Sequence, residues 1–401
     1  MTARTSNAQA EAFIVDAVRT PIGRLGGALA GIRADDLLAG AFKGLLQRLP
    51  TLDPAAIDEV YVGDANGAGE DNRNVARMAA LLAGLPVSVP GATVNRLCGS
   101  GMEAVIDGSR MVAVGDAELV LVGGVESMTR APWVMLKPSK AFPTTHEQMW
   151  NSALGWRMIN PQMPAEWTIS LGEGAEVLAE RFDISREVQD EFAAGSHQRA
   201  AAAWDAGWFD GELVPVAGVE LARDECIRPD STAATLAKLK PVFKIGGTVT
   251  AGNSSPMNDG ASAMLLATEA ALAGLGVQPL ARIASRATSG VAPHLFGIGP
   301  VEAARTALKR AGIGWGDVAA VELNEAFAAQ SLACLHAWPE LDRAKVNSQG
   351  GAIALGHPLG CSGARIITTL AHHLRRTGGR YGLAAMCIGV GQGIAVVIES
   401  C

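Results

Sequence analysis

The sequence predicts an α/β fold made of two similar halves, and two observations lead to this prediction. The first is that apolar runs typical of buried strands alternate with amphipathic runs typical of helices. Residues 117–125 (AELVLVGGV) are typical of a buried strand, whereas a helix is predicted by apolar residues at helical spacing, namely Leu37, Leu38, Ala41, Phe42 and Leu45. This alternation favours α/β layers, in which we expect mainly parallel sheets.

The second observation is that the order of elements near the start recurs near the end. A helical run at 35–49 leads into LDPAAIDEVYVGD, and another at 301–311 leads into IGWGDVAAVELNE. TVNRLCGSGMEAV then parallels KVNSQGG…GCSGARII, and LVLVGGVESM parallels LAAMCIGVGQG. Chance similarity between two α/β units is the alternative, but the repeated order favours a duplicated half-fold. Two packed copies would create a cleft, which is a common place for a site.

Composition limits the class of protein. The 401 residues are too many for one ordinary domain, so we expect two or three. Hydrophobic residues make up 49% and charged residues 18%, which favours a large buried core over disorder. The net charge is −7, from 33 basic and 40 acidic residues, and no basic run indicates nucleic acid as a partner. An anionic ligand would therefore need a local group of cations.

The cysteines and the apolar runs bear on metal sites and location. The six cysteines lack CxxC spacing, so we expect no zinc site. The first residues, MTARTSNAQAEAF, have no apolar signal core. No apolar run reaches about 18 residues, so we expect no membrane span. We therefore expect a cytoplasmic, reducing location in which the cysteines are thiols.

The middle of the chain breaks the pattern. Residues 131–170 carry five prolines and no clear period, and six of the eight tryptophans lie between Trp133 and Trp208. A structureless surface loop would not hold so many large rings, so we expect an inserted subdomain that covers the cleft or makes an oligomer contact. A helix should follow, with Ser185 as its N-cap and Glu187 in its first turn.

Cys98 stands where a strand is expected to pass into a helix. ATVN precedes it, and apolar residues recur at helical spacing from Met102 to Ile106. The free N–H groups and dipole of a helix N-terminus stabilise a thiolate, so we expect a lowered pKa for Cys98. Gly99 and Gly101 should leave room for a ligand close to the backbone. A nucleophile is presented in this way, but a buried structural cysteine remains the alternative.

A cysteine nucleophile needs a base, and His357 has the most constrained surroundings of the seven histidines. Pro358 favours extended geometry at His357, and a helix is expected from Ser362 onwards. The stretch GGAIALGHPLGCSGAR places glycines around the ring at positions 350, 351, 356 and 360. A structural histidine is the alternative at this position.

Cys387 is the third candidate. AAMCIGVGQGIAVVI is typical of a strand, a glycine turn and a second strand, with Cys387 at the mouth of the turn. A thiol there can transfer a proton, but a core cysteine would show the same pattern.

Together these stretches resemble the thiolases, the acyl-CoA acetyltransferases. VNRLCGSGMEAV is similar to the segment with their acyl-accepting cysteine, and GGTVTAGNSSPMNDGA to their CoA-side loop. VELNEAFAAQ is similar to their Asn-Glu-Ala-Phe motif, and GGAIALGHPLGCSGAR and MCIGVGQG to their histidine and second-cysteine motifs. The resemblance runs from about Ala12 to Glu399.

The resemblance implies a duplicated five-layered α-β-α-β-α fold with an inserted loop domain. Residues 1–130 and 236–275 would form the N-terminal half, residues 131–235 the loop domain, and residues 276–401 the C-terminal half. It also implies a homo-oligomer, either a dimer or a tetramer.

The resemblance also implies catalytic roles. Cys98 would take the acyl group as a thioester, and His357 would activate it. Cys387 would be the second acid/base, acting on the CoA thiol in cleavage and on an acetyl methyl group in condensation. His357 and a water carried by Asn324 would hold the enolate oxygen, and the backbone N–H groups of Cys98 and Gly389 would hold the thioester oxygen.

The CoA contacts follow from the same resemblance. Arg228 would lie against the adenine or its phosphates, although a solvated arginine is the alternative. The pantetheine path would be lined by Ala251, Ser255 and Phe327, with an ordinary turn as the alternative. Glu325 is interpreted as one member of a structural ion pair.

Two departures from the family pattern concern the acyl end. Ser170 stands where some thiolases have a histidine, and Ser255-Pro256 replaces the more usual Ser-Gly pair. Both bear on contacts with the acyl group and leave the catalytic motifs intact.

The choice of substrate rests on further segments. RAPWVMLKPSKAF, GWRMINPQM and GVAPHLFGIGP are most similar to the 3-oxoadipyl-CoA thiolases of aromatic degradation. These cleave 3-oxoadipyl-CoA with CoA to succinyl-CoA and acetyl-CoA. The distal carboxylate of that substrate would need a cation or donors. Four residues in these segments are candidates, without a choice among them: Arg130, Lys137, Arg157 and His294.

Three other functions remain as alternatives. The first is a general acetoacetyl-CoA or short-chain acetyltransferase. The second is a ketosynthase, which normally uses two histidines where this chain offers Cys387 as second helper. The third is a non-catalytic acyl-CoA-binding protein. For the enzyme we expect CoA and acyl-CoA as substrates, no permanently bound cofactor and no metal; no GxGxxG or phosphate-loop signature indicates a nucleotide.

Overall fold

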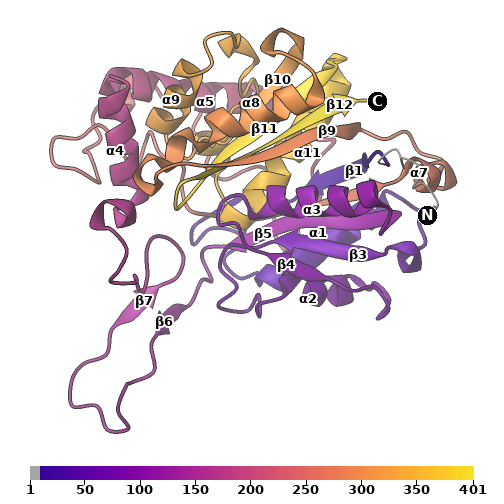
Figure 1. Cartoon of the computed structure of the whole chain (residues 1–401), viewed down its shortest axis with the longest axis horizontal. Helices are drawn as coiled ribbons and strands as arrows, with labels where there is room; N and C mark the ends of the chain where they lie inside the picture. The colour runs from indigo at the N-terminus through magenta and orange to yellow at the C-terminus, as the bar shows by residue number, and fades with distance from the viewer. Residues whose placement is uncertain (1–9) are drawn as a thin grey trace, which may run out of the picture.

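The computed structural model describes residues 10–401, which form two layered halves and an inserted segment (Figure 1). The first half contains β1 (Phe13–Arg19), β2 (Gly23–Arg24), α1 (Ala34–Gln47), β3 (Glu59–Gly63), α2 (Val75–Ala83), β4 (Ala92–Val94), α3 (Ser100–Val114), β5 (Leu119–Ser127), β8 (Asn258–Ala267) and α7 (Glu269–Leu275). The inserted segment contains β6 (Trp133–Met135), β7 (Met149–Asn151), α4 (Leu171–Arg181), α5 (Arg186–Asp205) and α6 (Ala233–Leu236). The second half contains β9 (Ala281–Gly290), α8 (Gly299–Ala311), β10 (Val318–Leu323), α9 (Ala328–His336), α10 (Ala352–Leu355), α11 (Leu359–Thr377), β11 (Tyr381–Ile388) and β12 (Gln392–Ser400).

The two halves use the same order of strands. The first half runs β4–β3–β5–β8–β1 and the second runs β10–β11–β12–β9. A bridge from Val321 of β10 to Val346 lies at the outer edge, where the first half has β4. The halves join where β1 pairs with β9 over two residues. This repeated topology confirms the predicted duplication.

The expectation of mainly parallel sheets is wrong. Among the described strands of the large sheet, three pairings are parallel: β3 with β4, β3 with β5, and β10 with β11. A helical crossover joins strands of this kind. β11 and β12 are joined instead by a short turn at 389–391, which permits only antiparallel pairing. β8 enters after the inserted segment and runs antiparallel to both β5 and β1.

Five layers stack through the two halves. The large sheet folds into two layers, one from the strands of each half. α1 and α2 cover the outer face of the first-half layer through one apolar cluster, and α8 covers the outer face of the second-half layer through another. α3 and α11 lie between the sheets, where their apolar side chains share a third cluster with β5, β8, β11 and β12 (Figure 1). The order α-β-α-β-α is therefore confirmed, and the innermost layer contains the two helices that follow Cys98 and His357 in sequence.

The two central helices touch at glycines. A Cβ atom on Gly101 of α3 would lie 2.6 Å from the carbonyl oxygen of Gly360, and one on Gly363 of α11 would lie 2.2 Å from a backbone nitrogen of α3. The crossing therefore depends on glycine in both helices. The space beside Gly101 is filled by α11, and the space beside Gly99 by Ile388, so the expectation that these glycines make room for a ligand is wrong.

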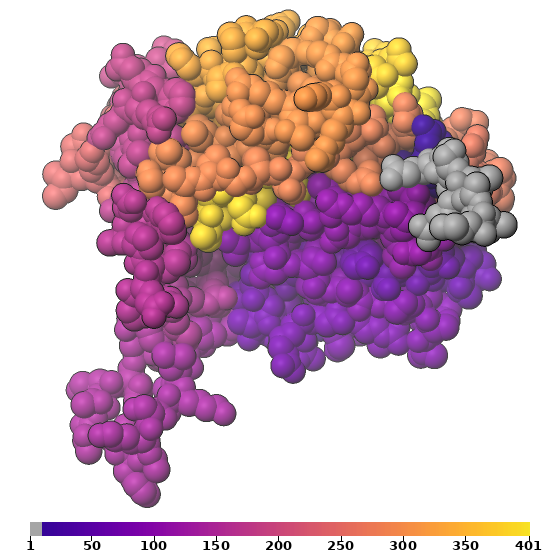
Figure 2. Space-filling view, in the orientation of Figure 1, coloured from indigo at the N-terminus to yellow at the C-terminus, as the bar shows by residue number. Residues whose placement is uncertain are grey.

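One part of the inserted segment projects from the molecule, and another part lines a cavity. The β6–β7 hairpin stands away from the two halves (Figure 2), with exposed fractions of 65% for Trp133 and 89% for Phe142. These rings face solvent in the single chain, so the hairpin itself does not cover the cleft, and the oligomer contact is the expectation that applies to it. Residues 152–157 return to the body and line a cavity beside Cys98, as the expected cover would. Ser185 caps α5 by accepting a hydrogen bond from the backbone N–H of Val188, as predicted.

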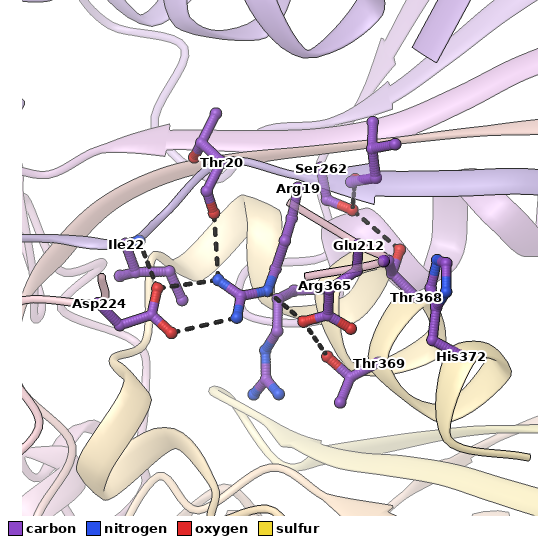
Figure 3. A network of polar contacts seen from close by, with 12 residues as sticks. Arg19, Thr20, Ile22, Glu212, Asp224, Ser262, Arg365, Thr368, Thr369 and His372 are labelled. Atoms are coloured by element: carbon purple, nitrogen blue, oxygen red, sulfur yellow. Dashed lines mark hydrogen bonds and ion pairs between the residues drawn. The ribbon is translucent and has the colours of Figure 1, made fainter. Parts of the chain in front are cut away.

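A buried ion-pair network ties β1 to the inserted segment (Figure 3). The guanidinium of Arg19 donates to Glu212 at 2.5 Å and to Asp224 at 2.8 Å, and all three side chains are fully buried. Thr369 of α11 donates to the same Glu212 carboxylate at 3.1 Å. Removing one member would leave an uncompensated buried charge, so the network fixes how these elements dock. In the described part of the chain, no helix has the length and apolar character to cross a membrane.

Candidate active site

Cys98 lies in the turn between β4 and α3, directly before the N-cap residue Gly99, as the sequence predicts. The preceding residue, Leu97, has a φ of 49°, a left-handed conformation that is uncommon for a residue with a side chain. Cys98 is 8% exposed and lines a cavity of about 220 Å³ together with Gly389 and Val390. The turn thus presents the thiol to an enclosed space.

The expected lowering of the Cys98 pKa does not occur. Burial raises the pKa of the Cys98 thiol to about 11, because the charged form loses water. The backbone N–H groups of Gly389 and of Cys98 itself oppose this change by hydrogen bonding to the sulfur. Desolvation therefore outweighs the effect of the helix N-terminus, and the resting nucleophile is a neutral thiol.

His357 lies between α10 and α11, at the start of the second central helix, as predicted. Its backbone N–H donates to Asn258 Oδ1 at 2.9 Å, and its Nδ1 lies 2.6 Å from Ser362 Oγ. Burial lowers the pKa of the imidazole to about 3, and the nearby positive charge of Arg365 lowers it further. The ring is therefore neutral at physiological pH, which is the state that a base requires.

Asn324 lies beside His357, with its Nδ2 atom 3.5 Å from His357 Nε2. The Oδ1 atom of Asn324 is buried and has no hydrogen-bond partner among residues 10–401. A buried polar atom of this kind is usually satisfied by an ordered water or a ligand. The neighbouring Glu325 accepts hydrogen bonds from Ser196 and Asn347 and pairs with no cation among residues 10–401, so the expected ion pair is wrong.

Cys387 is buried near the end of β11, beside Phe327 and Phe296. Its pKa lies well above the ordinary value because of burial and because a charge on Cys98 would repel its own. Three residues later, the turn contains Val390 with a φ of 62°, a strained conformation for a β-branched side chain. The strained turn aims the N–H of Gly389 at the sulfur of Cys98.

The residues predicted to contact CoA lie outside the cavity lining. Ser255 donates from its backbone N–H and from its hydroxyl to the carbonyl oxygen of Ala326, so the CoA-side loop runs beside the segment with Asn324 and Phe327. Ala251 is exposed at the tip of this loop. Arg228 is exposed elsewhere, where its backbone N–H donates to His197 Nδ1 at 3.2 Å.

The four candidates for a distal carboxylate have different surroundings. Arg157 lines the cavity beside Cys98. Arg130 is paired with Glu70 at 2.5 Å, and Lys137 is exposed in the chain that links β6 to β7. His294 is half-buried and outside the cavity lining. Ser170, the position of the departure from the family pattern, forms a capping box with Glu173 at the start of α4.

The sequence prediction missed several polar residues around the site. Ser362 and Asn258 hold the ring and the backbone of His357. Glu126 lines the cavity and accepts from the N–H groups of Ala65 and Gly360, and burial raises the pKa of its carboxyl to about 7. Because Ser362 comes only five residues after His357, the sequence could have indicated that its hydroxyl contacts the ring. The contacts of Asn258 and Glu126 join segments far apart in the sequence, so no local pattern predicts them.

A thiol with backbone N–H donors at its sulfur, and a second thiol close enough to be affected by its charge, can transfer an acyl group through a cysteine thioester. Residues 12–270 match the family described as "Thiolase, N-terminal domain", and residues 277–400 match "Thiolase, C-terminal domain". The chain belongs to the thiolase family. This thiolase is accordingly an acyltransferase.

Similar proteins cover almost the whole thiolase chain. "Beta-ketoadipyl-CoA thiolase" of Escherichia coli is 53% identical over 399 residues, which is 97% of this chain and 99% of that protein. "3-oxoadipyl-CoA/3-oxo-5,6-dehydrosuberyl-CoA thiolase" of Escherichia coli strain K12 is 52% identical with the same coverage. Human mitochondrial 3-ketoacyl-CoA thiolase in complex with CoA superimposes with a TM-score of 0.92 at 42% identity, covering 98% of both chains. Acetyl-CoA acetyltransferase of Bacillus anthracis gives a TM-score of 0.92 at 39% identity, covering 99% of this chain and 100% of that one.

Proposed function

We propose that this thiolase cleaves 3-oxoadipyl-CoA with CoA to succinyl-CoA and acetyl-CoA, and that the reaction is reversible as a Claisen condensation. The observation that carries the reaction type is the placement of Cys98 in a cavity with Gly389 N–H aimed at its sulfur. The substrate is supported by relatives that are about half identical over nearly the full length and are named for 3-oxoadipyl-CoA.

In the first half-reaction, the proton of Cys98 passes to His357 as the sulfur attacks the C3 carbonyl carbon of the substrate. The C2–C3 bond then breaks, the thiol of Cys387 protonates the enolate carbon, and acetyl-CoA leaves. Because both Cys98 and His357 are neutral at rest, proton transfer accompanies the attack instead of preceding it.

In the second half-reaction, the Cys387 thiolate takes the proton of an incoming CoA thiol, which attacks the succinyl thioester on Cys98. Cys98 leaves, takes its proton back from His357, and succinyl-CoA is released. The backbone N–H groups of Cys98 and Gly389 stabilise the oxygen of the thioester during attack. His357 and a water held by the unpartnered Oδ1 of Asn324 stabilise the enolate oxygen.

CoA is a substrate in this scheme, with no permanently bound cofactor. Arg228 contacts the adenine end, and Ala251, Ser255 and Phe327 line the pantetheine path. The adjacency of the CoA-side loop and the segment ending at Phe327 supports this path.

The alternative is a general short-chain acetyltransferase that acts on acetoacetyl-CoA, which the solved acetyl-CoA acetyltransferase of Bacillus anthracis keeps open. The test compares kcat/KM for 3-oxoadipyl-CoA and acetoacetyl-CoA, because this ratio reports differential binding in the transition state. A strong preference for 3-oxoadipyl-CoA supports the proposal. An equal or reversed preference leaves the short-chain enzyme.

The covalent step has a separate test. Intact mass is measured after incubation with acetoacetyl-CoA in the absence of free CoA, for the native enzyme and for Cys98→Ala. We expect an added acetyl group in the native enzyme alone. A protein that binds acyl-CoA without catalysis would gain no mass, and that result would overturn the proposed role of Cys98.

We further propose that the enzyme works as a homo-oligomer, either a dimer or a tetramer. The projecting β6–β7 hairpin supports this, since it exposes Trp133, Met135, Phe142 and Met149 to solvent in the single chain. Light scattering on the full chain measures the state directly. A monomer at micromolar concentration would contradict the proposal.

A further inference from the structure

We propose that Arg157 binds the distal carboxylate of the acyl group carried on Cys98, and that this contact sets the preference for dicarboxylic 3-oxoacyl-CoA substrates. The inference rests on the proposed function, because it identifies the residue that recognises the free end of the same substrate. Among the described residues that line the cavity, Arg157 alone carries a positive charge.

Most N–H donors of the Arg157 guanidinium have no protein acceptor among residues 10–401. It makes one protein hydrogen bond, from Nη1 to the carbonyl oxygen of Ser152 at 3.0 Å. In the part of the chain that the structure describes, no carboxylate forms an ion pair with it, whereas Arg130 is held by Glu70 through two contacts of 2.5 and 2.6 Å. An arginine presents five N–H donors in a planar fork that suits a carboxylate. Arg157 therefore remains available for an anionic ligand.

The segment with Arg157 is held in place before any ligand binds. Ser152 is buried, donates to the carbonyl oxygen of Pro132 at 2.6 Å and accepts from Asn66 Nδ2 at 3.1 Å. Trp156 Nε1 donates to the carbonyl oxygen of Ile169 at 3.0 Å. These contacts fix the turn that leads into Arg157, which reduces the ordering cost when a substrate binds.

The rest of the cavity suits the chain between the two ends of the substrate. Its apolar lining includes Leu97, Leu154 and Leu171, which can enclose methylene groups. An ion pair in such a partly desolvated space is stronger than one in water. Glu126 is the acidic residue of the lining, and its Oε2 accepts from two backbone N–H groups, which compensate part of its charge.

The test measures kcat/KM for two substrates of equal chain length, 3-oxoadipyl-CoA and 3-oxohexanoyl-CoA, which lacks the distal carboxylate. For Arg157→Ala we expect a loss on the order of 100-fold with 3-oxoadipyl-CoA and a change within about threefold with 3-oxohexanoyl-CoA. Arg157→Lys keeps the charge without the fork, so it should recover part of the loss. Lys137→Ala removes a cation from the exposed hairpin and serves as the matched control.

The outcomes separate this inference from the proposed function. If the native enzyme prefers 3-oxoadipyl-CoA and Arg157→Ala keeps that preference, Arg157 is not the carboxylate ligand and the proposed function stands. If the native enzyme shows no preference between the two substrates, both are overturned. Equal losses with both substrates would indicate a structural role for Arg157 and would also overturn the inference. In the expected result, the activity that Arg157→Ala retains with 3-oxohexanoyl-CoA shows that the variant is correctly folded.

Discussion

The Nδ1 atom of His357 lies 2.6 Å from the hydroxyl oxygen of Ser362. That hydroxyl also lies 2.9 Å from the carbonyl oxygen of Pro358, to which it donates its proton. Since the carbonyl can only accept, Ser362 Oγ must accept from His357, and Nδ1 carries the proton. The lone pair of the imidazole is then on Nε2, the atom that faces Asn324. Ser362 thus selects the tautomer with an unprotonated Nε2, which the proposed proton transfer from Cys98 requires.

Replacing Ser362 by alanine should slow acyl transfer more than it weakens binding. Without the hydroxyl, the neutral ring can adopt the other tautomer and rotate, so we expect kcat to fall about 10- to 100-fold with a small change in KM. Steady-state kinetics and the rate of Cys98 acylation in single turnovers measure this. Ser362→Thr keeps the hydroxyl and should recover much of the rate. A similar loss in both variants would point to packing instead of the tautomer.

Alkylation of Cys98 should be slow at neutral pH, because the thiolate is the reactive form and the resting residue is a neutral thiol. Because burial raises the pKa of Cys98 to about 11, the rate of modification by iodoacetamide should keep rising between pH 7 and pH 10. The measurement is intact mass over time at each pH, with Cys98→Ser to exclude modification of other cysteines. A rate that is already maximal at pH 7 would show a thiolate–imidazolium pair and contradict the structure.

Glu126 should make stability depend on pH. Its pKa is raised from 4.5 to about 7 by burial, so the folded state binds its proton more tightly than the unfolded chain does. The associated stability is present below about pH 4.5 and is lost as pH rises towards 7, by up to about 1.4 kcal/mol per pH unit. Burial and the charge of Glu126 also raise the pKa of the Asp64 carboxyl beside it, so the pair together extends the loss to higher pH.

Thermal unfolding of Glu126→Gln between pH 5 and pH 8 tests this. The amide cannot ionise, so its midpoint should fall less steeply with pH than that of the native enzyme. Glu322, whose pKa burial raises to about 8, acts equally in both proteins and serves as the internal background. Parallel curves would show that Glu126 does not titrate in this range.

The helix crossing should not tolerate a methyl group. In Gly101→Ala the new Cβ would lie 2.6 Å from a backbone oxygen of α11, so the helices must separate at a cost of roughly 3 kcal/mol or more. We expect a lower unfolding midpoint and a loss of activity, because Cys98 and His357 precede the two helices. Gly40→Ala in the open middle of α1 is the control and should be neutral or stabilising by up to about 1 kcal/mol. Equal midpoints for the two variants would contradict the close crossing.

The sequence predicts well what depends on neighbours along the chain. The strand–helix turn at Cys98, the helix entrance at His357 and the strand–turn–strand at Cys387 all follow from local periodicity and glycine placement. The duplicated order of elements predicts the layers, because each repeat has its own helical and strand pattern.

Contacts between distant segments decide the rest. The pKa of Cys98 depends on how deeply the turn is buried, which the turn sequence does not contain. Arg130 and Arg157 both lie in segments that resemble those of 3-oxoadipyl-CoA thiolases. Arg130 pairs with Glu70, 60 residues away in the chain, whereas Arg157 lines the cavity. Gly101 has the pattern of a ligand-binding glycine, and its neighbour proves to be a helix from the other half.

The crossing of α3 and α11 also means that α3 is synthesised long before the helix that packs against it. Ribosomes add roughly 5–20 residues per second, so α3 is complete tens of seconds before α11 and β11 exist. During that interval the apolar face of α3, with Met102 and Val105, lacks the partners that later bury it, and Cys98 has neither His357 nor the N–H of Gly389. The nascent first half therefore keeps an apolar surface and a thiol without their later partners until the second half has been synthesised.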